Sequence, residues 1–193
     1  MICTSNYKNM NINGFKNVSI SGDHGLSVNY YGERFSKLAP KKDFWNVWHD
    51  NIGKIPVEQN NKFYIEHYYK EVLASLDAGE IYQKLDDSLL LCYEDHDAFC
   101  HRHIASAWFE LVLDIKVNEL KKEDDHYVII KRLNYIKEYL NEVMTNNLDM
   151  NGFSSIHALY MYRKGGKMIE DGKMMQRKAC SYDFDHCKKY VKK

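Results

Sequence analysis

The sequence predicts an α/β domain whose mostly parallel sheet is flanked by helices in a Rossmann-like three-layer arrangement, followed by a helical C-terminal appendage. Short apolar segments alternate with segments of helical spacing, as in βαβ units. Residues 88–92, Ser-Leu-Leu-Leu-Cys, lack polar alternation, which is typical of a strand buried on both faces. We place the α/β domain in residues 1–122. We expect the helical extension, residues 123–193, to pack on the same domain.

Each expected element has a local signal. Four segments have strand character, and five have helical periodicity or a cap. Strands are expected at residues 2–5, 17–20, 88–92 and 114–118, the last as an edge strand, and helices at about 43–51, 57–76, 98–111, 126–144 and 154–162. Gly165-Gly166 should end the last helix. Residues 22–42 contain three glycines and read as a long loop, and loops of this length are usually functional.

Composition restricts the function classes. The hydrophobic fraction of 45% fits a globular protein, and a formal net charge of zero argues against a dedicated duplex-DNA binder. The stretch from Lys164 to Lys193 is rich in lysine. A solvated surface explains it better than a nucleic-acid patch. Five cysteines, with no export signal and no apolar run of membrane length, predict a cytoplasmic protein with free thiols.

The most informative segment begins at the end of the buried strand. Cys92-Tyr93-Glu94 is followed closely by Cys100-His101-Arg102-His103, which opens the next helix. Open α/β sheets bind ligands where strands end and helices begin. A thiol at a helix N-terminus has a lowered pKa, and an arginine there can hold phosphate or carboxylate. Histidine and glutamate can transfer protons.

The role of each thiol stays open at this point. Cys100 precedes Ile104 by four residues and so falls on the core stripe of the helix, which favours a packed thiol over a reactive one. Cys92 at the strand end is read equally well as a buried apolar residue or a functional one. The site residues converge best if the helix begins at or after Cys100.

A zinc site is the third interpretation of the same segment. Cysteine and histidine donors are sufficient in number, but their spacing fits no standard zinc pattern. Cys180, His186 and Cys187 form only an irregular second couple. We therefore predict no metal and no cofactor. The segment also lacks a phosphate loop, a Gly-x-Ser-x-Gly elbow and a His-Glu-x-x-His helix.

The block from Leu-Leu-Cys92-Tyr-Glu94 to Phe-Cys100-His-Arg102-His resembles the signature of the domain of unknown function 488 family. The opening Thr4-Ser5-Asn6-Tyr7 and the loop from Tyr30 to Lys41 resemble family segments more loosely. The resemblance covers roughly residues 1–120 and implies a compact α/β domain. It maps Cys92, Glu94, Cys100, His101 and Arg102 onto the motif, and Thr4, Ser5 and Tyr7 onto the first strand end.

This chain departs from the family after the second strand. Many members have an acidic-Val-Arg run there, whereas this chain has Ser19-Ile20-Ser21-Gly22-Asp23. If that arginine binds an anion in those members, the role falls to Arg34 or Lys37 here. The segment after about residue 123 has no counterpart in the family pattern. The resemblance therefore implies a fold and a site, and no particular reaction.

The leading hypothesis is a small-anion site, for phosphate or a nucleotide-like ligand, at the strand-end crevice of a thiol-dependent hydrolase or transferase. The catalytic candidates are Cys92, Glu94, Cys100 and His101, and the ligand-binding candidates are Arg102, Thr4, Ser5, Tyr7, Arg34 and Lys37. One alternative is a nucleic-acid-associated module that uses the basic tail. Another is a structural or interaction protein, in which Arg102 pairs with a carboxylate and the thiols are inert. No membrane partner is expected, and the sequence does not fix the oligomeric state.

Overall fold

The computed structural model describes residues 1–124, 126–150 and 152–170, with side chains as far as residue 165. The chain divides into two compact units, Met1–Leu148 and Asp149–Lys193, and each is described by itself. The sheet extends past residue 123 within the first unit. A separately folded domain of residues 1–122 stays a prediction.

The first unit contains one six-stranded sheet in the order β3-β2-β4-β1-β5-β6. All neighbouring strands are parallel except the antiparallel pair β5–β6. The strands are β1 (Cys3–Asn6), β2 (Lys16–Ser19), β3 (Glu33–Arg34), β4 (Ser88–Cys92), β5 (Asn118–Glu123) and β6 (His126–Ile130). This mostly parallel sheet with flanking helices confirms the predicted α/β class.

The central strand β4 positions the candidate site. All five of its residues are buried, as the uninterrupted apolar run predicted. Asn6 of β1 lies opposite Cys92, and Ser19 of β2 lies opposite Leu91. The carboxyl ends of three parallel strands therefore meet at one edge, where open α/β sheets place ligands.

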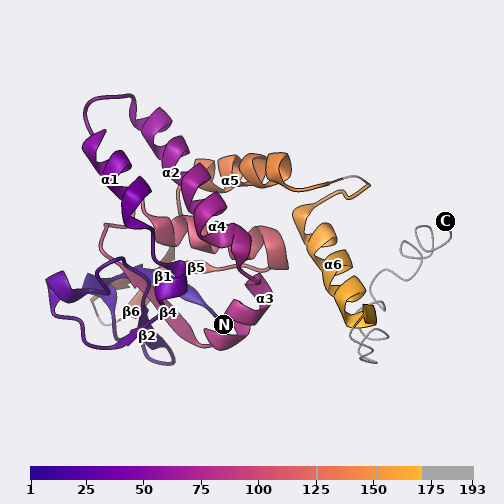
Figure 1. The fold of residues 1–193 in the computed structure, drawn as a ribbon. Coiled ribbons are helices and arrows are strands. Elements are labelled where there is room, and N and C mark those ends of the chain that lie inside the picture. The colour runs from indigo at the N-terminus through magenta and orange to yellow at the C-terminus, as the bar shows by residue number, and fades with distance from the viewer. Residues whose placement is uncertain (125, 151, 171–193) are drawn as a thin grey trace. The chain divides into compact units, whose positions relative to one another are not determined.

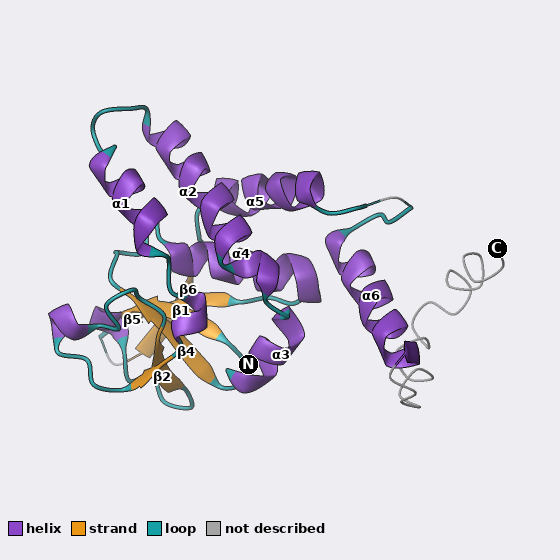
Figure 2. Ribbon diagram, viewed as in Figure 1, coloured by secondary structure: helices purple, strands orange, loops and turns teal. Residues whose placement is uncertain are grey.

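Helices cover one face of the sheet, where α2, α4 and α5 pack against one another in Figures 1 and 2. The helices of this unit are α1 (Lys42–Asp50), α2 (Val57–Glu71), α3 (Ala78–Lys84), α4 (His101–Leu113) and α5 (Asn134–Asn147). Every residue of α4 from His101 to Phe109 is buried, so α4 is the central helix of the layer. Its burial on all sides explains why its polar residues need partners inside the fold.

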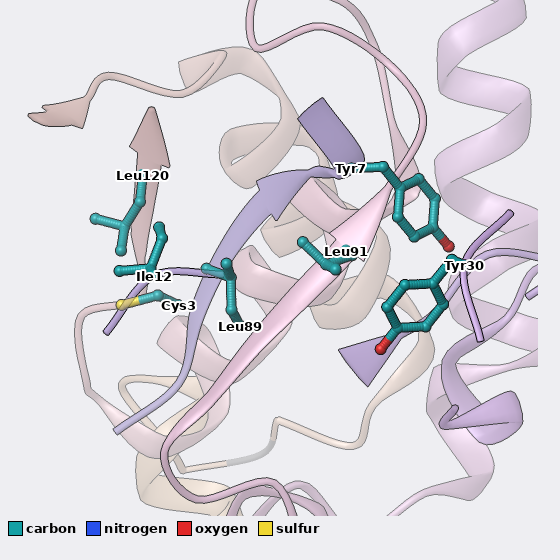
Figure 3. Packing of buried hydrophobic residues seen from close by; sticks show 7 residues of the cluster. All are labelled: Cys3, Tyr7, Ile12, Tyr30, Leu89, Leu91 and Leu120. Atoms are coloured by element: carbon teal, nitrogen blue, oxygen red, sulfur yellow. The ribbon is translucent and has the colours of Figure 1, made fainter. Parts of the chain in front are cut away.

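A second core lies on the opposite face of the sheet (Figure 3). Alternate residues of a strand point to opposite faces, so Leu89 and Leu91 of β4 enter this core while Leu90 and Cys92 face the helices. The members of this second core are Cys3, Tyr7, Ile12, Tyr30, Leu89, Leu91 and Leu120. Cys3 and Cys92 therefore belong to different faces of the sheet.

The structure corrects the expected helix at 126–144. Residues 126–130 form β6, and α5 begins only at Asn134. The segment His-Tyr-Val-Ile-Ile is rich in aromatic and β-branched residues, which suit a strand, and it pairs with β5 through a hairpin. Ile129, which lies within the range of that expected helix, is 60% exposed.

Two further segments differ from expectation. Residues 114–118 do not form an edge strand. Asp114 has a left-handed backbone at φ 53° and ends α4, and β5 begins at Asn118 between two neighbouring strands. Residues 78–84 form α3, a helix that was not predicted from the sequence. The Asp77 side chain accepts a hydrogen bond from Glu80 N (3.0 Å) and caps α3.

The second unit contains α6 (Ile156–Glu170) in its described part. The helix expected near 154–162 is present, but Gly165-Gly166 do not break it. Most of the basic tail lies outside the described residues, as does the Cys180–His186–Cys187 couple. No described helix combines the length and the apolar character that crossing a membrane requires.

Candidate functional site

The two thiols of the motif lie at the ends of consecutive elements. Cys92 is the last residue of β4, and Cys100 immediately precedes the first residue of α4. Both side chains are buried. The helix begins after Cys100, and not near Ala98 as its periodicity suggested. This later start is the condition under which the motif residues converge.

Glu94 and His101 both contact the two sulfurs. Glu94 Oε2 lies 3.2 Å from Cys92 Sγ and 2.9 Å from Cys100 Sγ. His101 Nδ1 lies 3.6 Å from Cys92 Sγ and 3.9 Å from Cys100 Sγ. His101 Nε2 donates to the carbonyl oxygen of Ile20 over 2.9 Å, and a carbonyl can only accept. That bond fixes the ring so that Nδ1 faces the thiols.

The surroundings move the pKa values of the two thiols apart. Burial raises the pKa of Cys92 well above its usual value, and the neighbouring Cys100 raises it further. Burial also opposes ionisation of Cys100. The hydrogen bond from Cys92 and the charges of Arg102 and His101 outweigh burial, and the pKa of Cys100 falls well below its usual value. Of the two thiols, Cys100 is therefore the one that ionises more readily.

The Glu94 carboxyl can gain or lose a proton near neutral pH. Burial raises its pKa to about 7, with a further contribution from the negative charge of Cys100. The 2.9 Å contact between Glu94 and Cys100 holds one proton, which lies on Glu94 when Cys100 is ionised. His101 responds in the same sense: burial lowers its pKa, but the Cys100 thiolate outweighs burial and raises it.

These four side chains line a cavity of about 520 Å³. Its volume lies within the range of small-molecule sites. Aromatic side chains from α1, α2 and the loop before α4 form much of the wall, and Lys42 supplies a cation. The lining residues used below are Lys42, Trp45, Trp48, Tyr64 and Phe99. Gly22, Asp23, Ser27 and Pro40 come from the long loop, which therefore contributes to the site as expected of its length.

The same cluster includes a donor set that a soft divalent metal accepts. One donor atom each from Cys92, Cys100 and His101 lies within 4.8 Å of the others. Zinc binds cysteine sulfur and histidine nitrogen. This grouping was not apparent from the spacing of the residues, because the two thiols come together through the fold of the β4–α4 loop.

Arg102 belongs to a different cluster. Its side chain is 0% exposed, and Nε donates to Glu119 Oε1 over 3.0 Å. Nη2 donates to the carbonyl oxygen of Asp95. His96 Nδ1 lies 2.7 Å from Glu119 Oε1, and His103 Nε2 lies 3.6 Å away. Arg102 thus pairs with a carboxylate, as expected of an arginine that serves the fold, and it does not line the cavity.

Glu119 is held as a carboxylate in this cluster. Burial alone would raise its pKa, but the contacts with His103 and His96 and the charge of Arg102 outweigh burial and lower the pKa far below its usual range. Among the described residues, Arg102 Nη1 has no hydrogen-bond partner. Charge pairing, more than complete hydrogen bonding, therefore defines the cluster.

The other predicted ligand-binding residues lie outside the cavity wall. Thr4 Oγ1 donates to Glu119 Oε2, and Ser5 Oγ donates to the Leu120 carbonyl over 2.6 Å. The Tyr7 hydroxyl bonds to Ser19 Oγ and Ser21 Oγ behind the pocket, at 2.6 and 2.8 Å. Arg34 and Lys37 are exposed.

Sequence reasoning missed the aromatic wall and Lys42. Trp48 and Tyr64 pack edge to face, with ring centroids 5.4 Å apart, and Phe99 packs on both. In the sequence, Trp48 and Tyr64 match ordinary core positions of two helices. The start of the expected helix, after Pro40-Lys41, was the one signal that could have pointed to Lys42.

The comparisons with known proteins bear on the family. No curated protein and no solved structure matches the chain. A family model, described as the active DUF488-N3 subclade, matches residues 16–112. The matched span runs from β2 through most of α4 and includes every residue of the Cys92–Arg102 block. The chain belongs to the DUF488-N3a family.

Proposed function

We propose that the chain is a thiol-dependent hydrolase or transferase that acts on a small nucleotide-like anion in the 520 Å³ cavity, with Cys100 as the nucleophile. The observation that carries the proposal is the convergence of Cys100, Glu94 and His101 on the wall of one cavity. A description of the subclade as active agrees with retained chemistry.

Cys100 is the better nucleophile of the two thiols. It sits at the N-terminus of α4, where unpaired N–H groups and the helix dipole favour a negative charge. Its lowered pKa reflects the same preference, whereas the pKa of Cys92 is raised. The thiolate is the reactive form, so Cys100 reacts at a pH where Cys92 stays protonated.

In this mechanism Glu94 transfers protons and His101 stabilises the thiolate. Cys100 Sγ attacks the electrophilic carbon or phosphorus of the substrate, and the leaving group takes the proton that Glu94 carries. The Glu94 carboxylate then accepts a proton from water, or from an acceptor hydroxyl, as that oxygen displaces Cys100 Sγ. A pKa of about 7 lets Glu94 serve in both directions. His101, held by its bond to Ile20, stabilises the thiolate whenever it is free.

The wall of the cavity supports a ligand with a planar ring and an anionic group. The indole of Trp45 is partly exposed at 38%, and Trp48, Tyr64 and Phe99 continue the aromatic surface inward. Aromatic side chains stack on bases without sequence preference. Lys42, at the start of α1, supplies a positive charge for a phosphate or carboxylate. Arg102 is not part of this ligand site because Glu119 engages it.

The test combines native-state alkylation with ligand stabilisation. Iodoacetamide should modify Cys100 quickly in the folded protein, and Cys100→Ser should remove that reaction while Cys3→Ser leaves it unchanged. A nucleotide should raise the melting temperature by mass action and slow the alkylation. Thiols inert to alkylation in the native state would overturn the proposal in favour of a structural role. Protection by zinc alone would point instead to a metal centre.

A further inference from the structure

We propose that Cys92 is a resolving thiol for Cys100, so that a hydroperoxide converts the pair into a reversible disulfide that switches the site off. This inference rests on the proposed function in one respect, the reactivity of Cys100 at the cavity wall. It assigns a role to Cys92, a buried thiol at the centre of the site that the proposed reaction does not use.

The geometry brings the two sulfurs together. They lie within 4.8 Å of one another and share two neighbours, Glu94 Oε2 and His101 Nδ1. A disulfide needs the sulfurs to approach to about 2.05 Å, which calls for side-chain rotation and a small shift of the backbone. The connecting residues 93–99 are loop in which no side chain is fully buried, so the chain between the thiols can adjust.

The chemistry balances with a hydroperoxide as oxidant. The Cys100 thiolate attacks one oxygen of hydrogen peroxide, the O–O bond breaks, and the departing hydroxide takes a proton to become water. Cys100 is then a sulfenic acid. Cys92 Sγ attacks the Cys100 sulfur and displaces its hydroxyl group. Glu94 accepts the proton of the Cys92 thiol and passes it to the departing hydroxyl, which leaves as a second water.

Glu94 contacts both sulfurs, so it can transfer the proton when the disulfide forms. Cys92 donates its thiol proton toward Glu94 Oε2 over 3.2 Å, so the base for the second step is already in contact. Glu94 also contacts Cys100 Sγ, where the leaving hydroxyl forms. The cavity that both thiols line is large enough to admit a peroxide molecule. Without a resolving thiol, a peroxide-sensitive thiolate oxidises further to irreversible forms.

Cys3 provides a matched control. It is buried like the other two thiols, but it lies in the core on the opposite face of the sheet with Leu89 and Leu91. Burial also raises the pKa of the Cys3 thiol, so it does not compete for peroxide. We therefore expect peroxide to leave Cys3 unmodified.

The experiment treats the full-length protein with hydrogen peroxide and maps its thiols by mass spectrometry without reduction. The wild type should yield one peptide pair linked through Cys92 and Cys100. Iodoacetamide labelling of Cys100, read from the peptide that contains it, should be lost and should return on adding dithiothreitol. Cys3→Ser should behave as the wild type. Cys92→Ser, with Cys92→Ala as a second variant, should instead give a dimedone adduct at Cys100 and then sulfinic acid, with a loss that dithiothreitol does not reverse.

The outcomes separate this proposal from the function on which it rests. Sulfinic acid at Cys100 in the wild type, with no linked peptide, would overturn the resolving role and leave Cys100 as a nucleophile. A Cys100 that resists both iodoacetamide and peroxide would overturn the resolving role and the proposed function together. If dithiothreitol did not reduce the Cys92–Cys100 disulfide, the oxidation would be irreversible, and the proposed switch would be overturned.

Discussion

Two clusters of polar and charged side chains lie at the start of α4. One lines a cavity, and the other is built around a buried ion pair. Cys100 and His101 line a cavity, and Cys100 contacts Glu94, whose pKa of about 7 lets it gain or lose a proton near neutral pH. Arg102, the next residue along the helix, faces Glu119 in a pair from which solvent is excluded. Successive helix residues point about 100° apart, so one short motif serves both clusters.

The contrast shows that neighbouring residues of one short motif can have different roles. In the pocket cluster (Cys92, Glu94, Cys100 and His101), the pKa of Cys100 is lowered, that of Cys92 is raised, and that of Glu94 is raised to about 7. In the ion-pair cluster (Glu119, Arg102, His96, His103 and Thr4), the carboxylate is locked in one charge state. Perturbed pKa values of nucleophilic and proton-transferring groups beside a cavity suggest chemistry. Glu119 and His103 line a second cavity of about 390 Å³, but Glu119 is already paired with the buried Arg102, so this cluster suggests a structural role. Substitutions should therefore affect reactivity in one cluster and stability in the other.

The largest effect is expected from Glu119→Gln. This change removes the negative charge and leaves the Arg102 guanidinium buried and unpaired. We expect a loss of about 3–5 kcal/mol in the free energy of unfolding, measured by urea titration. Glu123→Gln, an exposed glutamate on the same strand, should change it by less than about 0.5 kcal/mol. Equal stability of the two variants would contradict the structural role of the pair.

Cys100→Ser should reduce thiol reactivity strongly and leave the free energy of unfolding almost unchanged. Fast alkylation of the thiols in residues 1–124, mapped peptide by peptide, should fall by about 100-fold, because Cys3 and Cys92 in this described part are buried and have raised pKa values. The free energy of unfolding should change by about 1 kcal/mol or less, since serine nearly matches cysteine in size. Stopped-flow or time-course labelling measures the first quantity, and urea titration the second. If the stability fell as far as in Glu119→Gln, the contrast between the clusters would collapse.

Trp45→Ala tests the aromatic wall of the pocket. Loss of one stacking surface should weaken a bound nucleotide by about 1–3 kcal/mol, measured by calorimetry. Val47→Ala is the matched control: it lies on the same helix, is also exposed, and does not line the cavity. An equal loss of affinity in both variants would place the ligand elsewhere.

The smallest effect concerns pH. Glu94 has a pKa of about 7 in the fold and about 4.5 when exposed, so between these values the folded state binds more protons than the unfolded state. Its contribution therefore favours folding below pH 4.5 and is lost as the pH rises through 7. Glu94→Gln should remove on the order of 1 kcal/mol of this pH dependence, measured as unfolding free energies at pH 5 and 7.5. An unchanged profile in the variant would show that Glu94 titrates normally.

The parts of the fold that depend on the local sequence pattern could be predicted. The apolar run of β4 predicted a strand buried on both faces. The motif that follows it indicated that Cys92 and Cys100 could lie in one site. The sheet class followed from the alternation of strands and helices. Residues 126–130 were mistaken for helix because their apolar positions also fit a helical period, and pairing with β5 decides between the two.

The contacts that depend on distant residues were not predictable. Glu119 carried no signal as the partner of Arg102, since β5 reaches it only through the register with β1. The aromatic wall comes from α1, α2 and the loop before α4, and only the packing of these segments turns core-like residues into a cavity lining. Arg102 looked like an anion ligand because the sequence shows its charge and not its neighbour.

The place of β4 in the sheet has a consequence for how the chain assembles. β1 and β2 are consecutive in the chain, yet β4 lies between them and joins them by hydrogen bonds on both of its edges. The segment that fills this place begins about seventy residues after β2 in the chain. Contacts between residues far apart in sequence form slowly, because loop closure costs entropy before the contact stabilises the chain. We therefore expect the pocket, which combines Ser21 and Gly22 after β2 with Cys92 at the end of β4, to form only after β4 has paired with β2.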